Sequence, residues 1–254
     1  MRIAVYSVYY GNREPFNPEC LHEAEGYDRF VVTDREYLKT DATIITEPLF
    51  ALDPKRASLR AKLRPYRYFK EYDWTIYLDN KANLLKDPSV IINNLDYGSF
   101  FCFLLGGRDC IYEEAKICIK RGLEEPNIIR RQMKTYTYDK FPRHAGLIQS
   151  TLLIRRMDDP QWEKAGEHWF EQVLRHARRD QLSFNYVAWK LDLKPQYLPG
   201  NVHENDYIQW PILFKDEDFK HNFEFIPKNL RKRGKKVLGQ LGILGFLRGR
   251  QHSL

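Results

Sequence analysis

The clearest candidate for chemistry is an aspartate at the end of an apolar strand. The run 74–78 (Trp-Thr-Ile-Tyr-Leu) is typical of a buried strand, and Asp79 closes it before the polar turn 80–83. In open α/β sheets, ligands bind where such strands end, and carboxylate oxygens suit Mg²⁺ or Mn²⁺. We therefore expect Asp79 to hold a divalent cation against a diphosphate. The alternative is an aspartate that only caps the turn.

Basic residues precede this strand at helical spacing. Arg56, Arg60, Arg64 and Arg67 recur at intervals of three and four, so on a helix they could share one face. Guanidinium groups bind phosphate oxygens in pairs, and such a face would neutralise a pyrophosphate. A solvated basic surface is the alternative. The residues expected to bind the donor of a transferred group are Tyr9, Arg60, Lys62, Arg67, Asp79 and Lys81.

Two later loops carry residues that could contact the acceptor, the molecule that receives the transferred group. Arg108 and Asp109 follow the apolar run 99–105 and a pair of glycines, in a loop of the kind where sites are usually built. His144 stands two residues before Gly146, and a glycine lets the backbone approach a ligand closely. We expect all four residues on the acceptor side.

A third polar segment supplies the candidates for catalysis. Asp180, followed by Gln181, could act as a general base on an acceptor hydroxyl or hydrogen-bond two hydroxyls of a sugar. An N-cap of the helix that follows is the alternative for Asp180. His203, in a polar turn, could ligate the same cation as Asp79, although a lone histidine is more often a surface residue.

The pattern of apolar runs and breakers predicts one α/β domain with a mostly parallel sheet flanked by helices. The predicted domain covers residues 1–226, and a basic, apolar tail covers 227–254. The helix starting at Ile111 opens with Glu113 and Glu114, which complement the helix dipole. Strands are predicted at 3–9, 30–34, 42–46, 74–79, 99–105 and 147–155, and helices at 55–70 (kinked at Pro65), 111–121, 123–134, 160–176 and 180–191.

Composition narrows the range of expected binding partners and the expected cellular location. The net charge of +7 favours an anionic ligand or surface. Four scattered cysteines indicate reduced thiols, and neither a signal peptide nor a spanning segment is recognisable, so we expect a cytoplasmic protein. The tail joins the cluster 228–236, with six basic residues, to an apolar stretch, which suits attachment to the inner face of an anionic membrane. A disordered solubilising tail is the alternative.

Six segments, taken in order, resemble a family of GT-A-like glycosyltransferases that was long catalogued as a domain of unknown function. It includes plant mucilage-related proteins and bacterial polysaccharide-locus proteins. The similarity covers roughly residues 3–210, and its most specific parts are Arg-Asp-Cys-Ile-Tyr-Glu-Glu-Ala and Arg-Asp-Gln-Leu-Ser-Phe. The six segments are 64–67, 72–79, 108–115, 146–149, 154–156 and 179–184.

The resemblance implies a GT-A fold, a nucleotide-sugar donor, a saccharide or lipid-linked acceptor, and a site at the end of the Asp79 strand. One departure concerns the metal: GT-A enzymes typically carry Asp-x-Asp, whereas this chain reads Asp79-Asn80-Lys81. The charge of Lys81 could replace part of that of a cation, which leaves metal dependence open. A nucleotidyltransferase making nucleotide sugars and a nucleic-acid-binding protein are the rival functions. Against the first, the segment 9–13 after the first strand is a poor Gly-rich phosphate loop. Against the second, the basic residues cluster without a recognised nucleic-acid-binding motif.

Overall fold

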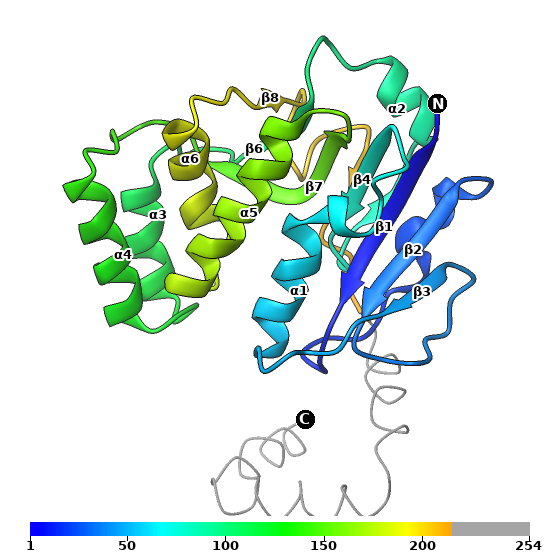
Figure 1. The fold of residues 1–254 in the computed structure, drawn as a ribbon, viewed down its shortest axis with the longest axis horizontal. Helices are drawn as coiled ribbons and strands as arrows, with labels where there is room; N and C mark the ends of the chain where they lie inside the picture. Colours follow the sequence, from blue (N-terminus) through cyan, green and yellow to red (C-terminus); the bar gives the residue numbers. More distant parts are fainter. Residues whose placement is uncertain (215–254) are drawn as a thin grey trace, which may run out of the picture. The chain divides into compact units, whose positions relative to one another are not determined.

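The structure is a computed structural model that describes residues 1–214. Residues 1–11 and 17–213 form one compact unit, and every element below belongs to it (Figure 1). The predicted boundary at residue 226 and the predicted tail 227–254 lie outside the described residues. Within the described part, no helix combines the length and the apolar character needed to cross a membrane.

Seven strands form the central sheet, in the order β3-β2-β1-β4-β7-β6-β8. Strands β1 to β4 run parallel, β7 is antiparallel to both of its neighbours, and β8 is parallel to β6. A small second sheet pairs β5 with β9. The bounds are β1 Ile3–Tyr9, β2 Asp28–Thr33, β3 Thr43–Thr46, β4 Trp74–Leu78, β5 Asn83–Leu84, β6 Phe100–Leu104, β7 Ile148–Arg156, β8 Gln196–Tyr197 and β9 Ile208–Gln209.

The reversed strand β7 brings two distant segments to one edge of the sheet. Because β7 runs against β4, its first residues lie beside the last residues of β4, with Leu78 opposite Leu152. The backbone N–H of Asp79 continues the ladder and donates to the carbonyl of Thr151 at 2.9 Å. The strand-end aspartate and the start of β7 are therefore neighbours.

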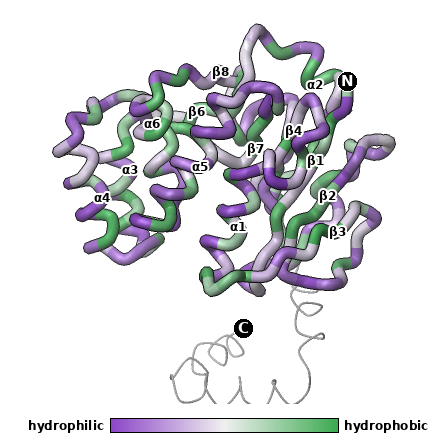
Figure 2. The backbone as a smooth tube through the Cα atoms, viewed as in Figure 1, coloured by the Kyte–Doolittle hydropathy of each residue, from purple (hydrophilic) through white to green (hydrophobic). Residues whose placement is uncertain are grey.

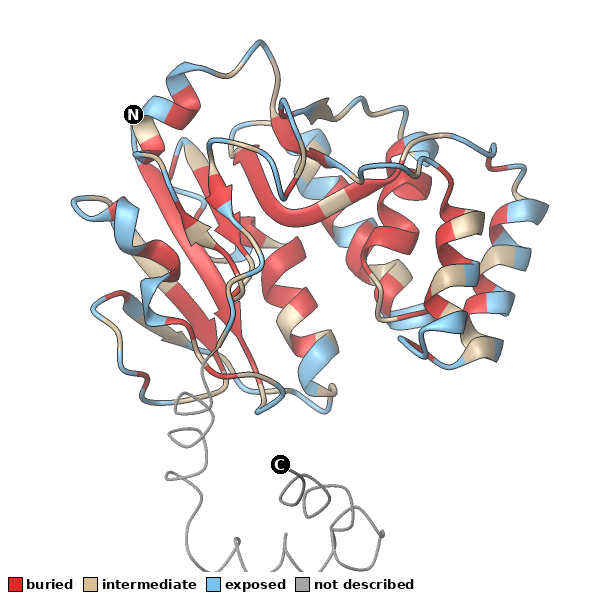
Figure 3. Cartoon of the chain, turned by 180° about the vertical axis from the view of Figure 1, so that it is seen from behind, coloured by how far each residue is buried: buried red, intermediate tan, exposed pale blue. Residues whose placement is uncertain are grey.

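The middle of the sheet is buried on both faces. All seven residues of β1 are buried, and Figure 3 shows the central strands mainly in red with exposure concentrated in loops and outer helix faces. A strand covered on both faces reads as a continuous apolar run rather than an alternating one, as 3–9 does. This explains why the sequence pattern locates these strands well.

An acidic residue followed by proline begins four of the helices. The side chains of Asp53, Asp87, Glu125 and Asp159 each accept a hydrogen bond from a backbone N–H of the first turn, and the following proline has no N–H to leave unpaired. The helices are α1 Pro54–Leu63, α2 Pro88–Asn93, α3 Ile111–Lys120, α4 Pro126–Tyr138, α5 Pro160–Arg175 and α6 Gln181–Lys190. Single 3₁₀ segments occupy Pro18–Ala24 and Pro65–Arg67.

The main core lies where helices cover the sheet. Helix α1 packs against β1 and α5, and α6 contacts β7, α5 and α3. Along α4 the tube passes repeatedly between purple and green, as expected for a helix with one apolar side (Figure 2). Rings from strand and helices meet at Phe100, which stacks on Trp162 and Phe184 with centroids 4.4 and 5.1 Å apart.

The predicted fold class is confirmed, and the predicted long elements are found within a few residues. The predicted helix 55–70 is shorter: α1 ends at Leu63, and a 3₁₀ turn begins at Pro65, where the kink was expected. Sequence analysis missed α2, β5, β8 and β9, whose two to six residues are too few to show a periodic pattern. The four cysteines are free and buried.

Candidate active site

A buried lysine lies between two aspartates at the edge where β4 ends. The ammonium of Lys62 is 2.8 Å from Oδ2 of Asp180 and 3.6 Å from Oδ1 of Asp79. Its third contact is Oγ of Ser150, at 3.0 Å, and Ser150 itself donates to Oδ2 of Asp180 at 2.8 Å. The side chains of Lys62 and Asp180 are only 6% and 7% exposed. We call Lys62, Asp79, Ser150 and Asp180 the lysine cluster.

Asp180 is held ionised in this environment. Burial raises the pKa of its carboxyl, but the charges of Lys62 and Lys55 and the hydrogen bond from Lys62 outweigh burial and hold the pKa far below its usual value. Asp180 also caps α6, because its Oδ1 accepts from the N–H of Gln181 at 3.1 Å. The alternative interpretation of Asp180 as the N-cap of α6 is therefore confirmed.

The general-base role expected for Asp180 does not fit this environment. A carboxylate with a strongly lowered pKa has little tendency to take a proton. The nearly complete burial of its side chain also leaves little room for contact with a sugar hydroxyl. The structure assigns Asp180 to fixing Lys62, and Asp180 is then a positioning residue.

Asp79 is the accessible carboxylate of the lysine cluster, with 38% of its side chain exposed. The hydroxyl of Tyr77 donates to its Oδ1 at 2.6 Å. Burial and the charge of Asp79 raise the pKa of Tyr77 well above its usual value, so the phenol keeps the proton that it donates. The position predicted from the strand pattern is therefore both anchored from the core and open to a ligand.

Lys62 is also fixed through its backbone. The buried hydroxyl of Tyr6 donates to the carbonyl of Lys62 at 3.0 Å, and the guanidinium of Arg155 donates to the same hydroxyl at 3.2 Å. Burial raises the pKa of Tyr6 to about 12, even though the charge of Arg155 lowers it. Strand β1, strand β7 and helix α1 are thus joined directly behind the lysine cluster.

Gln181, which was predicted to be catalytic together with Asp180, lies beside the lysine cluster. Its amide donates to the carbonyl of Ile148 at 3.0 Å and to the side-chain oxygen of Gln149 at 2.8 Å. The guanidinium of Arg179 donates to its side-chain oxygen at 2.9 Å. The whole side-chain amide is therefore engaged within the protein, which makes Gln181 a link between α6 and the start of β7.

The predicted single basic face on α1 is wrong. Arg56 and Arg64 turn toward α5, where Arg64 pairs with Glu167 at 3.1 Å and Arg56 donates to the carbonyl of Val173 at 3.2 Å. Arg60 turns instead toward the loop after β3 and pairs with Glu47 at 3.0 Å. The three guanidinium groups therefore point in different directions, because each binds a different neighbour within the protein.

Arg60 belongs to a separate group of paired side chains around Glu47, and not to the lysine cluster. Glu47 accepts from Arg60, from Tyr10 at 3.3 Å and from Tyr68. Arg60 also donates to the carbonyl of Pro48 at 2.7 Å, and the residue is 6% exposed. These contacts explain the buried arginine by internal pairing, so its assignment to the donor phosphates loses its structural basis.

The other predicted donor residues lie at the same edge of the sheet or nearby. Tyr9 ends β1 and is 2% exposed, with the guanidinium of Arg35 4.7 Å from its ring centre. Lys81 follows Asp79 in the turn, and its carbonyl accepts from the N–H of Ile212 at 2.9 Å. Arg67 is the last residue of the 3₁₀ segment Pro65–Arg67 and is exposed. Their roles in donor binding stay predictions.

Two of the predicted acceptor-side residues are brought together. Nδ1 of His144 lies 2.7 Å from Oδ1 of Asp109. Gly146 has φ +87°, and a Cβ there would come within 2.9 Å of the Asn185 amide. Arg108 is bound elsewhere, in a 2.8 Å ion pair with the buried Glu114. The pair Asp109–His144 and Gly146 remain candidates for the acceptor side.

His203 is not paired with Asp79. Within residues 1–214 no ion pair joins the two, and the imidazole lies against the ring of Trp210, with centroids 5.1 Å apart. The segment after His203 nevertheless returns to the Asp79 turn, because β9 pairs with β5 and Ile212 contacts Lys81. A shared cation stays a prediction.

Asp79 fits a cation bound together with phosphates. Mg²⁺ in phosphate sites is commonly held by one or two carboxylates, with substrate oxygens and water completing its coordination. Asp79 offers one half-exposed carboxylate, and Lys62 already lies between it and Asp180. Asp79 would therefore be the protein ligand of such a cation, and Lys62 would supply a fixed positive charge beside it.

Sequence analysis missed Ser150, Tyr77 and Trp169. Trp169 donates from its indole N–H to the carbonyl of Asp180 at 2.9 Å, across the helix–helix contact. Serine, tyrosine and tryptophan in strands and helices look like ordinary core residues in a sequence. The available signal was position: Ser150 lies near the start of a strand next to the Asp79 strand, which only the antiparallel register reveals.

Solved structures with this fold include glycosyltransferases. The bifunctional glycosyltransferase WbbM, in its apo form, aligns with 78% of the chain at 12% identity and a TM-score of 0.50. The chain spans about two fifths (39%) of that protein. A glycosyltransferase that acts in glycosylating the major capsid of PBCV-1 aligns over 89% of this chain and 100% of its own at 11% identity, with a TM-score of 0.47 that is too low to add to the argument. The WbbM likeness shows the fold alone.

The sequence match is more direct. No curated protein matches the chain. The family described as "TOD1/MUCI70, glycosyltransferase-like domain" matches residues 42–204, which is more than half of the chain and includes Lys62, Asp79, Ser150 and Asp180. The chain belongs to the TOD1/MUCI70 family of glycosyltransferase-like domains.

Proposed function

We propose that this protein is a glycosyltransferase that moves a sugar from a nucleotide-sugar donor to a saccharide or lipid-linked acceptor. The observation that carries the proposal is the lysine cluster, in which the half-exposed Asp79 is held by Lys62 and Tyr77 at the carboxyl edge of the parallel strands. Ligands of open α/β sheets bind at this edge. Family membership supports the reaction class.

The leaving group of such a reaction is a nucleoside diphosphate, which needs positive charge as it departs. A divalent cation, when bound, would supply part of that charge. The chain supplies more: Lys62 is fixed beside Asp79, and Lys55 is close enough to Asp180 and Asp79 for their charges to interact. Asp180, Ser150 and the Tyr6–Arg155 pair hold Lys62 in place.

The place of the reaction is part of the same proposal. The acceptor would be lipid-linked, and the protein would act in the cytoplasm at the inner face of a membrane, in cell-surface polysaccharide synthesis. This location would account for the basic and apolar composition of the segment 227–254. Centrifugation of the full chain with anionic vesicles at low and high salt tests the membrane attachment, which screening should weaken.

Calorimetric titration with common nucleoside diphosphates, with and without Mn²⁺, tests the donor site. The wild type should bind at least one of them. Asp79→Asn should weaken Mn²⁺-dependent binding about tenfold to a hundredfold, because a contact to a charged group contributes about 1.5–3 kcal/mol. Sugar release from a panel of nucleotide sugars then measures turnover.

Asp158→Asn is the matched control. Asp158 pairs with Arg156 at 2.6 Å, and Arg156 lies opposite Trp74 at the start of β4, at the far end of that strand from Asp79. Binding and turnover should survive this change. A wild-type chain that binds no nucleoside diphosphate, or an Asp79→Asn chain with unchanged binding and turnover, would overturn the proposal.

A further inference from the structure

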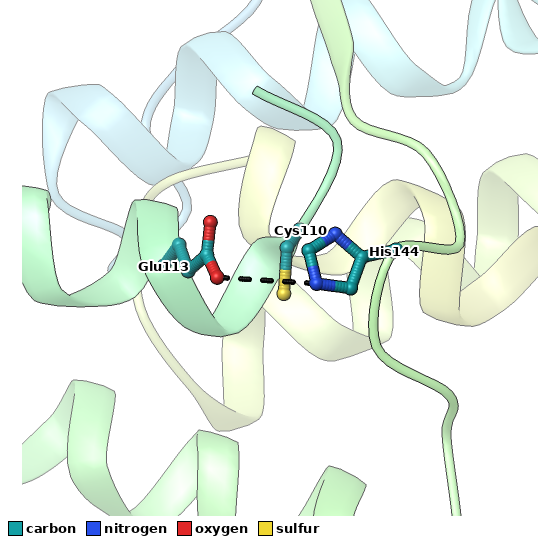
Figure 4. A group of neighbouring side chains, drawn as sticks. All are labelled: Cys110, Glu113 and His144. Atoms are coloured by element: carbon teal, nitrogen blue, oxygen red, sulfur yellow. Dashed lines mark ion pairs between the residues drawn. The ribbon is translucent and has the colours of Figure 1, made fainter. Parts of the chain in front are cut away.

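A second cluster of metal-binding side chains lies apart from the lysine cluster. Cys110, Glu113 and His144 each turn one ligand atom to a common point, and these atoms all lie within 4.8 Å of one another (Figure 4). Cys110 and Glu113 belong to the start of α3, and His144 belongs to the loop that precedes β7. We propose that these three residues bind a zinc ion.

Cys110 is placed to act as a thiolate ligand. It stands at the N-cap of α3, yet its side chain makes no capping hydrogen bond, and the residue is fully buried. Zinc binds cysteine as the thiolate, so binding of the ion at this sulfur would release the thiol proton. Glu113 follows three residues later, so its carboxylate lies on the same side of the helix.

His144 is oriented by a carboxylate, as metal-binding histidines usually are. Its Nδ1 lies 2.7 Å from Oδ1 of Asp109, and its Nε2 lies 4.0 Å from Oε1 of Glu113. A proton on Nδ1 directed at Asp109 leaves the lone pair of Nε2 facing Glu113 and Cys110. Such carboxylate–histidine pairs fix the tautomer and the ring orientation of the ligand.

The chemistry of the three ligand atoms favours zinc over other metals. Thiolate, imidazole and carboxylate together suit Zn²⁺, whereas Mg²⁺ and Mn²⁺ prefer oxygen ligands. With zinc bonds of about 2.0–2.3 Å, ligand atoms in a tetrahedron lie about 3.3–3.8 Å apart. The 4.0 Å gap between His144 and Glu113 needs a small contraction, and separations of up to 4.8 Å within the group would close by about 1 Å when the ion binds. Three protein ligands leave the fourth position for water or another ligand.

One positive group competes for Glu113. The guanidinium of Arg143 lies 3.2 Å from Oε1 of Glu113, the same oxygen that faces His144. The side chain of Arg143 is 55% exposed, so this ion pair is weak and can exchange to the other carboxylate oxygen. Two negative ligands, Cys110 and Glu113, then balance the charge of the ion.

The site would fasten a loop that leads into the active site. His144 precedes Gly146, and the following strand carries Gln149 and Ser150, which contact Gln181 and Asp180. An ion shared between His144 and the start of α3 would pin the entry to β7 on the acceptor side. This inference does not depend on the proposed transfer reaction.

Zinc binding to the chelator-treated, full-length protein tests the inference. Equilibrium dialysis should find one tightly bound Zn²⁺ per chain, and Co²⁺ in its place should give the intense sulfur-to-metal absorption of a thiolate complex. Cys110→Ser and His144→Ala should each weaken Zn²⁺ binding by more than about 100-fold, because even outer partners of metal ligands contribute 10–100-fold. The cobalt–sulfur absorption should vanish in Cys110→Ser.

Matched controls separate this site from other groups. Cys118→Ser alters a buried cysteine of the same helix, and His168→Ala alters an exposed histidine paired with Glu171; both should bind zinc like the wild type. Asp79→Asn should also keep the ion, so a failure of the donor site would not affect this result. Glu113→Gln and His144→Ala change half-buried or exposed side chains and keep the test open if Cys110→Ser fails to fold. A wild type without tight zinc binding, or variants at these two positions that bind normally, would overturn the inference.

Discussion

Replacing Lys62 by methionine should leave Asp180 as a buried carboxylate without its main partner. Methionine keeps the length of the lysine stem and removes the charge. Both side chains are less than a tenth exposed, so water cannot take the place of the ammonium at 2.8 Å. Removing one partner of a buried pair costs about 3–5 kcal/mol of the free energy of unfolding. The positive charges of Lys55 and Arg179 also stabilise the Asp180 carboxylate. We therefore expect a loss at the lower end of this range, about 3 kcal/mol.

The pH dependence distinguishes this cause from simple loss of packing. In the wild type, Lys62 keeps the pKa of Asp180 low despite burial. Without Lys62, burial dominates and the folded-state pKa rises above the unfolded value of about 3.9. The folded variant then binds more protons than the unfolded one between these two values, so its stability falls as pH rises through that window. The loss relative to wild type should be smaller near pH 4 than near pH 7.

Urea denaturation of the wild type and the variant at both pH values measures these differences. Lys70→Met is the matched control, because Lys70 pairs with Glu163 at 3.5 Å with both side chains largely exposed, and it should cost less than about 1 kcal/mol. Adding Asp180→Asn to Lys62→Met should recover part of the loss. A Lys62→Met loss below about 1 kcal/mol, or one independent of pH, would refute the argument that Lys62 balances a buried charge.

Three further predictions concern other parts of the fold. Glu124, whose hydrogen bond from Arg178 lowers its pKa to about 2, should stabilise the fold above its unfolded pKa of about 4.3 and lose that contribution as pH falls toward 2; Glu124→Gln should flatten this dependence in acid denaturation curves. Gly166→Ala should lower the free energy of unfolding by about 1–3 kcal/mol, because the new Cβ would lie 2.5 Å from the carbonyl of Leu63 where α5 crosses α1, whereas Gly106→Ala meets no neighbouring atom and should be nearly neutral. Gly146→Ala should cost more than Gly107→Ala in thermal unfolding, since both have positive φ but only Gly146 faces the Asn185 amide; equal losses would show that backbone strain alone acts there.

Local pattern located Asp79 but not its partners. A buried strand that ends in a polar turn is visible in one stretch of sequence, and the structure places Asp79 at that end. Lys62 and Asp180 were also singled out, but for opposite sides of the site, whereas they lie 2.8 Å apart. Their contact depends on the antiparallel register of β7 and on α6 packing beside it, which no local spacing encodes.

The arginines in and just after α1 show how a local pattern can suggest a ligand site where the side chains have internal partners. Arg56 and Arg60 do lie on α1, but Arg64 is already its C-cap. Each guanidinium is directed by a tertiary partner: the carbonyl of Val173 for Arg56, Glu47 for Arg60 and Glu167 for Arg64. The partner of Arg60, Glu47, follows β3 and gave no signal of its own in the sequence. Charge partners of this kind are tertiary, so a basic run cannot be assigned to a ligand until its internal neighbours are known.

The lysine cluster also constrains when the protein can become active during its synthesis. The contact between Lys62 and Ser150 spans 88 residues, and Asp180 follows another 30 residues after Ser150. While the ribosome is still making the second half, α1 and the first four strands have emerged, but the counter-charge of Lys62 has not. Contacts so distant along the chain form slowly, because a long loop must close first. A nascent chain that stops before Asp180 therefore carries Asp79 without the helix that fixes its neighbour, so the lysine cluster cannot be complete before α6 has been synthesised.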